Sequence, residues 1–110
     1  MTVPIPPIFV VDRQGVDLSV YASIADAELD LETIDVNNNE YFGYDSEGRL
    51  LELKTVHNKV VITPVEDRPS HVSDLSGSLR EFLKAVNEPV KSDDLAVLVE
   101  ACRKFTRRFS

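Results

Sequence analysis

The spacing of apolar and polar residues changes several times along the chain, and each change predicts a new element. Residues 8–11 form a short apolar run, and residues 16–21 alternate apolar with polar side chains before ending in two apolar ones. Both patterns are typical of β-strands. Residues 12–15 between them are turn formers, so the two strands are predicted to pair as a first hairpin.

Two periodicities overlap in residues 23–33. Every second residue from 25 to 31 is apolar, as in a strand, and the positions between them are acidic. The residue types, however, are Ala, Leu and Glu, which are good helix formers, and Ser23 is a suitable N-cap. We therefore predict a helix. Its expected buried stripe is Ile24, Ala27, Leu31 and Ile34.

A three-stranded antiparallel meander is predicted between residues 40 and 65. The expected strands are residues 40–44, 50–56 and 59–65. In the first loop Gly48 can supply a left-handed residue, and Tyr44 is expected to pair with Arg49 across that loop. The dipeptide at 57–58 makes the second, tight turn.

Two helices are predicted in the C-terminal third. The first is capped by Ser73 or Asp74 and continues to Val86, with apolar residues at three- and four-residue spacing. The second is capped by Ser92. Its last turns are expected to contain Arg103, Lys104, Arg107 and Arg108, which suit the negative end of the helix dipole. Its expected buried stripe is Leu95, Leu98, Val99, Cys102 and Phe105.

These elements predict an α+β fold. It has an antiparallel sheet of four to five strands, one helix inserted after the first strands, and two C-terminal helices packed on the sheet. A length of 110 residues with 43% hydrophobic content suits a single domain, residues 1–110, that buries a real core. Residues 1–7 contain three prolines and no basic residue, which predicts an extended lead-in rather than a signal peptide.

Cysteine content and hydropathy bear on the compartment. The only cysteine, Cys102, cannot form an internal disulfide, which fits a reducing cytosol and predicts a cytoplasmic protein. The longest apolar run is about four residues, far below the roughly 20 needed to cross a bilayer. The formal net charge of −7 argues against nucleic acid or an anionic membrane as a ligand.

Negative charge is concentrated in the middle of the chain. Residues 26–52 contain nine carboxylates and one base, Arg49, so this segment carries −8 and the rest of the chain +1. Such a segment is either a solvated face that aids solubility or a docking face for a basic partner. Both readings stay open at this point. Tyrosines set among the acids would favour docking, because aromatic side chains supply contact area and carboxylates steer a basic partner.

The sequence lacks residues that the known catalytic and metal-binding motifs require. Residues 35–39 begin like a calcium loop, but Glu40 replaces the required glycine and Ser46 the required glutamate. His57, His71 and Cys102 lack ligand spacing, and the expected arrangement is two solvated histidines and a buried thiol. Nucleophile, phosphate-binding and dinucleotide motifs are also missing from the sequence. We therefore expect no enzyme activity, no metal and no cofactor.

The stretch YASIADAELDLETIDVNNNEYFGYDSEGRLL, residues 21–51, resembles a pattern found in small bacterial proteins of unknown role. Some small acidic α+β proteins of this kind resemble immunity proteins, which neutralise a cognate toxin delivered between competing bacteria. The resemblance implies one-to-one binding of a basic toxin domain, often a nuclease, by an acidic surface that covers the toxin's active site.

The leading hypothesis is a cytosolic, stoichiometric inhibitor of the immunity or antitoxin type. The carboxylates are expected to converge into one outward surface. The expected partner-binding residues are Asp26, Glu28, Asp30, Glu32, Glu40, Tyr41, Asp45 and Glu47. The alternatives are a structural or housekeeping module, monomeric or homodimeric, and a small enzyme with an unrecognised site.

Overall fold

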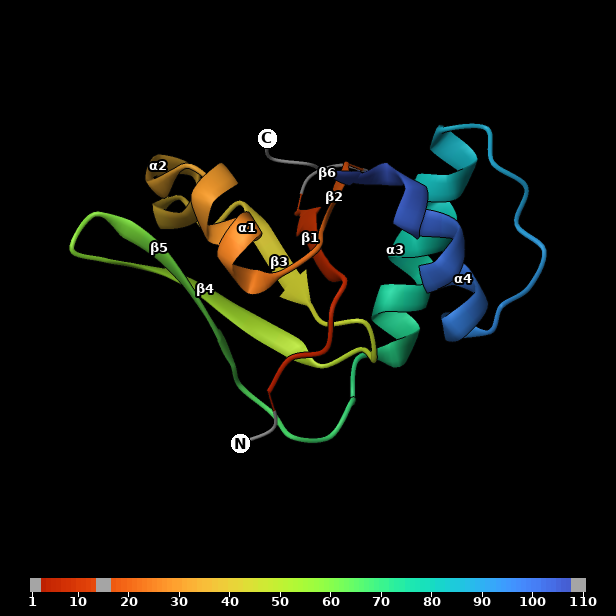
Figure 1. The fold of residues 1–110 in the computed structure, drawn as a ribbon, viewed down its shortest axis with the longest axis horizontal. Helices are drawn as coiled ribbons and strands as arrows, with labels where there is room; N and C mark the ends of the chain where they lie inside the picture. Colours follow the sequence, from red (N-terminus) through yellow and green to blue (C-terminus); the bar gives the residue numbers. More distant parts are fainter. Residues whose placement is uncertain (1–2, 14–16, 108–110) are drawn as a thin grey trace.

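A six-stranded mixed sheet with a pair of helices on each face forms the computed structural model, which describes residues 3–13 and 17–107 (Figure 1). In chain order the elements are β1 (Ile8–Asp12), β2 (Leu18–Tyr21), α1 (Ile24–Asp30), α2 (Thr33–Asn37), β3 (Tyr41–Tyr44), β4 (Leu50–Val56), β5 (Lys59–Pro64), α3 (Val72–Ala85), α4 (Leu95–Cys102), the 3-10 helix η1 (Arg103–Phe105) and β6 (Thr106–Arg107). The strand order across the sheet is β5-β4-β3-β1-β2-β6. The α+β class is therefore confirmed.

The predicted hairpin and meander are both present. Strands β1 and β2 pair antiparallel from Ile8 opposite Tyr21 to Val11 opposite Leu18, and β3, β4 and β5 follow one another antiparallel. The β4–β5 turn consists of two residues with positive φ, as its length requires. The predicted turn at 12–15 and the start of the second predicted strand lie partly outside the described residues.

The predicted register across the first meander loop was wrong by one residue. Tyr44 pairs with Leu50 rather than with Arg49. The loop is longer than a tight turn because Asp45 organises it: the Asp45 N–H donates to the Arg49 carbonyl, and the Asp45 carboxylate accepts further bonds from the loop. Gly48 takes the positive φ that the sequence predicted there.

The sheet is mixed and not purely antiparallel, because the last predicted helix ends early. Helix α4 ends at Cys102, and η1 turns the chain so that Thr106 and Arg107 form β6, parallel to β2. Phe105 makes this turn favourable by packing edge-to-face on Phe82, with ring centroids 5.1 Å apart. Arg107 thus belongs to a strand, and Arg108 lies outside the described residues.

Helix α1 begins as predicted but ends sooner. Ser23 is the N-cap and accepts a hydrogen bond from the Asp26 N–H (3.1 Å). Leu31 then adopts an extended conformation, and a separate short helix, α2, follows. Because Leu31 interrupts the helix, the residues after it do not continue the buried stripe of α1. Ala27 is buried as predicted, whereas Ile34 is 63% exposed and does not belong to the buried stripe.

The caps of the two C-terminal helices also differ from the prediction. Helix α3 starts at Val72 with His71 at the N-cap position, so Ser73 and Asp74 lie within its first turn. Helix α4 is capped by Asp94, whose carboxylate accepts from the Ala96 N–H, and not by Ser92. Both helices still pack on the sheet, as the apolar spacing predicted.

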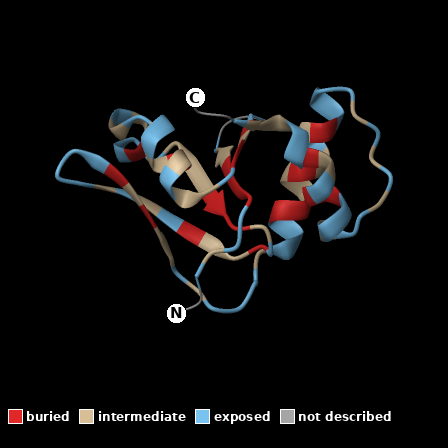
Figure 2. Ribbon diagram, in the orientation of Figure 1, coloured by how far each residue is buried: buried red, intermediate tan, exposed pale blue. Residues whose placement is uncertain are grey.

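Two hydrophobic clusters cover the two faces of the sheet, because side chains alternate along each strand. In Figure 2 the buried residues, coloured red, lie on the central strands and on helices α3 and α4. The cluster under α3 and α4 consists of Phe9, Leu18, Val20, Tyr44, Leu75, Leu79, Leu83, Leu98, Val99 and Cys102. The cluster under α1 and α2 consists of Ile8, Val10, Tyr21, Ala27, Val36, Leu51, Val60 and Ile62. Within residues 3–13 and 17–107, every helix is too short or too polar to span a lipid bilayer.

Candidate functional site

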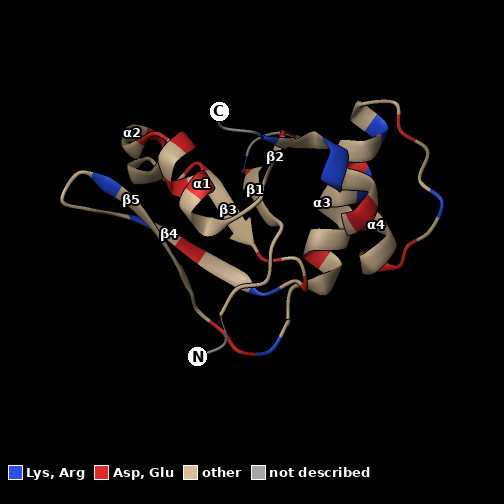
Figure 3. Cartoon of the chain, viewed as in Figure 1, with Lys and Arg blue, Asp and Glu red and all other residues tan. Residues whose placement is uncertain are grey.

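Helices α1 and α2 form an acidic face that also exposes apolar side chains. Neither helix contains a lysine or arginine, and carboxylates gather over both of them (Figure 3). Leu29 on α1 is 79% exposed and Ile34 on α2 is 63% exposed, although both are large aliphatic residues. The sequence predicted the charge here but not the exposed apolar groups, because it placed Ile34 in the buried stripe.

Three carboxylates of this face are hydrogen-bonded within the fold. Glu28 Oε2 accepts from the backbone N–H of Ile62 on β5 (2.8 Å). Asp30 Oδ2 accepts from the Tyr21 hydroxyl (2.6 Å) and lies 3.6 Å from an Arg107 guanidinium nitrogen. These acids therefore stabilise the fold as well as carrying charge.

The third such carboxylate is Asp35, whose Oδ2 accepts from the Tyr41 hydroxyl (3.3 Å). Partial burial and the charge of Asp35 together raise the pKa of Tyr41. Tyr41 is thus partly buried, and its hydroxyl is engaged by Asp35 within the fold.

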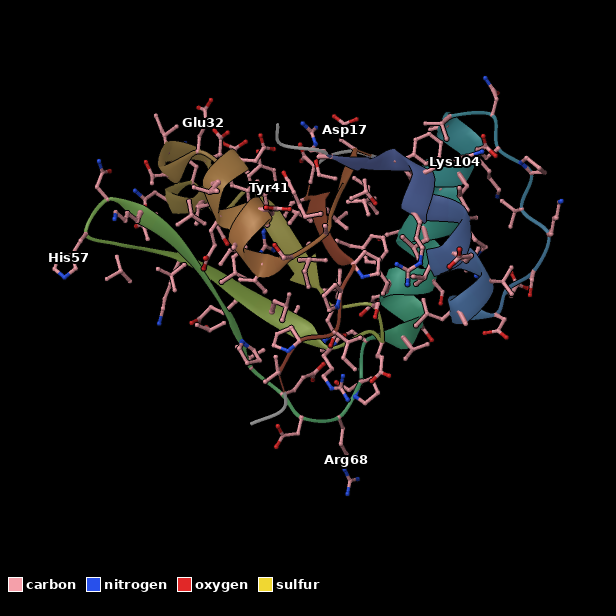
Figure 4. The ribbon with its side chains drawn as sticks, in the orientation of Figure 1. Asp17, Glu32, Tyr41, His57, Arg68 and Lys104 are labelled. Atoms are coloured by element: carbon pink, nitrogen blue, oxygen red, sulfur yellow. The ribbon has the colours of Figure 1, made fainter. Side chains whose placement is uncertain are left out.

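The remaining acids near these helices have no side-chain partner among the described residues. Asp26, Glu32 and Glu40 make no side-chain hydrogen bond or ion pair within the described part of the chain. Glu32 lies on the outer side of the helical pair (Figure 4). Unpaired carboxylates keep their full charge available to an incoming basic group.

Asp45 does not lie on an outward surface, and its placement in the docking face was wrong. Its side chain is fully buried, and it accepts bonds from the N–H groups of Ile5, Glu47 and Arg49. The Arg49 guanidinium adds a fourth bond at 3.0 Å, and the pKa of that guanidinium is raised mainly by this carboxylate. Asp45 is thus a structural anion that holds the β3–β4 loop.

Glu47 is exposed and lies on the same β3–β4 loop, and Figure 1 shows that this loop lies away from α1 and α2. It pairs with Arg49 at 2.8 Å. The loop instead contacts the start of α3, where the His71 N–H donates to the Gly48 carbonyl (2.9 Å). The eight predicted residues therefore do not form one continuous surface, and those near α1 and α2 are the ones the fold brings together.

A second polar cluster surrounds His71, which the sequence predicted to be solvated. His71 Nδ1 lies 2.9 Å from Glu66 Oε1, and Ser70 hydrogen-bonds the other Glu66 oxygen. Bonds from Ser70 and from the Leu50 N–H lower the pKa of Glu66 to about 2. The His71 ring also packs against Tyr44, with centroids 6.2 Å apart. No pattern in the sequence marked this pairing, because Glu66 and His71 lie in a segment without periodicity.

The other predicted single residues are placed as expected. His57 is exposed at the tip of the β4–β5 hairpin (Figure 4), and Cys102 is a buried free thiol whose pKa burial raises to about 11. Within residues 3–13 and 17–107, no three His, Cys, Asp or Glu side chains lie close enough to hold a metal ion.

Comparison with protein-family models, with curated proteins and with solved structures found no match to this chain.

Proposed function

We propose that this protein is a stoichiometric binding protein of the immunity or antitoxin type, and that its α1–α2 face docks on a basic protein. One observation carries the proposal: Leu29 and Ile34 are exposed on two helices that contain acids and no bases. Solvation of a charged face does not require large aliphatic side chains at its surface. Protein interfaces, in contrast, combine apolar anchors with a charged rim.

The two kinds of group have separate roles in such a complex. Free carboxylates at Asp26, Glu32 and Glu40 would speed the encounter with a basic surface, and this effect falls as salt is added. Burial of Leu29 and Ile34 would slow dissociation, since apolar burial sets most of the affinity of a preformed interface. This division of roles fits a tight one-to-one inhibitor with no turnover.

The experiment compares capture from a lysate of the source organism by three immobilised forms of the protein. These are the wild type, the double variant Leu29→Ser/Ile34→Ser, and the charge-reversed control Glu81→Lys/Glu100→Lys on α3 and α4. We expect the wild type and the control to retain the same basic protein at a 1:1 ratio, and the double variant to lose it. Association of the purified pair should slow at least tenfold between about 50 and 500 mM salt. Retention of one partner by all three forms would exclude the α1–α2 face.

A further inference from the structure

The C-terminal strand places an arginine at the border of the acidic α1–α2 face. Arg107 lies on β6, and a nitrogen of its guanidinium is 3.6 Å from Asp30 Oδ2 on α1. Within residues 3–13 and 17–107, no other base forms an ion pair with an acid of α1 or α2. The charge of the proposed docking face is therefore partly neutralised by a side chain of the same molecule.

This ion pair is loose on the Arg107 side and fixed on the Asp30 side. A separation of 3.6 Å is longer than a hydrogen bond, and the Arg107 side chain is 55% exposed. Asp30, in contrast, accepts a 2.6 Å hydrogen bond from the hydroxyl of buried Tyr21. Departure of Arg107 would thus leave the Asp30 carboxylate in position for another cation.

A cleft beside the ion pair gives another cation room to enter. It has a volume of about 560 Å³ and is lined by the N-terminal lead-in, the start of α1 and the C-terminal segment. Asp26, Arg103 and Arg107 contribute to the lining. Asp26 precedes Asp30 by four residues, so the two carboxylates are neighbours on one side of α1. A basic side chain of a partner would meet both carboxylates once Arg107 has moved.

The position of Arg107 is not needed to hold β6 in the sheet. An exposed ion pair contributes little to stability, because solvent screens it. The strand is held instead by its pairing with β2 and by the packing of Phe105 on Phe82. We propose that Arg107 is an autoinhibitory contact: it occupies the place of a partner's basic side chain on the α1–α2 face and is displaced when a basic partner binds. This inference rests on the proposed function, because it concerns the regulation of the same face.

The test measures binding of a fluorescein-labelled octalysine peptide by fluorescence anisotropy at about 100 mM salt. We expect Arg107→Gln to bind the peptide about two- to fivefold more tightly than the wild type, the range that loss of one exposed ion pair allows. The matched control is Arg103→Gln. Arg103 lines the same cleft and carries the same charge, but it pairs with Glu100 on α4 at 2.7 Å. This control should tighten binding less than about 1.5-fold, because it releases no acid of the α1–α2 face.

Two further variants separate the contact from general effects of charge and folding. Arg107→Lys keeps the charge and should bind the peptide as the wild type does. In an Asp30→Asn background, Arg107→Gln should have no effect, because the partner of the arginine has been removed. Equal tightening by both glutamine variants, or an undiminished effect of Arg107→Gln in the Asp30→Asn background, would overturn the inference. A lysate capture that yields no partner would contradict the proposed function alone, since the peptide measurement does not depend on the natural partner.

Discussion

Removing the Asp45 carboxylate is predicted to be the most damaging single change in the β3–β4 loop. In Asp45→Ala, the N–H groups of Ile5, Glu47 and Arg49 lose their acceptor. The Arg49 guanidinium, only 11% exposed, loses its buried counter-ion and keeps its contacts with exposed Glu47 and the Asp67 carbonyl. The variant therefore removes the shared acceptor of several part-buried donors at once.

The magnitude follows from these contacts. A hydrogen bond to a charged group contributes about 1.5–3 kcal/mol, and breaking a buried ion pair by removing one partner costs about 3–5 kcal/mol. Four full bonds would overstate the loss, because water can reach a surface loop once the side chain is gone. We expect a loss of about 3–5 kcal/mol in the free energy of unfolding. That is a large part of the roughly 5–15 kcal/mol typical of a domain.

Urea unfolding measured by circular dichroism tests this value. With a slope of about 2 kcal/mol per molar urea, the midpoint of Asp45→Ala should fall by about 2 M. The matched control is Glu47→Ala, which removes the exposed carboxylate from the same arginine and should cost less than about 1 kcal/mol. Equal midpoints for the two variants would refute the assignment of Asp45 as a buried structural anion.

Three further predictions concern single residues. Because the pKa of Glu66 is lowered from 4.5 to about 2, its carboxylate contributes its full stabilisation above pH 4.5 and loses it as the pH falls toward 2. Glu66→Gln should therefore flatten the dependence of the urea midpoint on pH in that window, and a slope identical to that of the wild type would contradict this. Cys102, buried with its pKa raised to about 11, should react with iodoacetamide at pH 8 only after unfolding, and rapid labelling of the native protein would be the opposing result. Gly48→Ala should destabilise the protein by about 1–3 kcal/mol, because φ is +91° and the new Cβ would lie 2.9 Å from the Val72 Cα. The matched control Gly77→Ala, in a helix with open space around the new Cβ, should be neutral or stabilising by up to about 1 kcal/mol. Similar urea midpoints for the two variants would contradict the backbone strain assigned to Gly48.

Elements specified by local pattern could be predicted from the sequence. The β1–β2 hairpin and the β3–β5 meander depend on alternation and turn residues that lie next to each other in the chain. Ser23 could be identified as an N-cap for the same reason, since the cap and its helix are contiguous. In the strands, residue types agree with periodicity, and in residues 23–33 the helix-forming residue types and the Ser23 cap outweigh the alternating pattern, so no distant contact is needed to decide between helix and strand.

Elements decided by distant contacts could not be predicted. Strand β6 forms because Thr106 and Arg107 pair with Val20 and Tyr21, more than 80 residues earlier in the sequence, and the helical spacing before them gave no sign of it. The break at Leu31 likewise changed the exposure of Ile34, which became part of the candidate docking face.

The distribution of charged residues along the chain also does not predict which acidic side chains are buried. Asp45 and Glu47 are both acidic residues of the same loop, yet the Asp45 side chain is buried and the Glu47 side chain is exposed. The only signal in the sequence was the Asp-Ser-Glu-Gly loop, in which an aspartate commonly bonds the backbone two residues ahead. The pairing of Glu66 with His71, in contrast, had no such signal, because it depends on how an irregular segment meets the start of α3.

The bond from the Ile62 N–H to Glu28 protects the outer edge of β5. An unpaired edge strand is a template on which another chain can add a strand and start aggregation. A side-chain oxygen at that position occupies a donor that an added strand would need, and its charge repels a second copy of the same acidic chain. Negative charge in the middle of this chain therefore also keeps the sheet from extending into the next molecule, whether or not the neighbouring acids ever meet a partner.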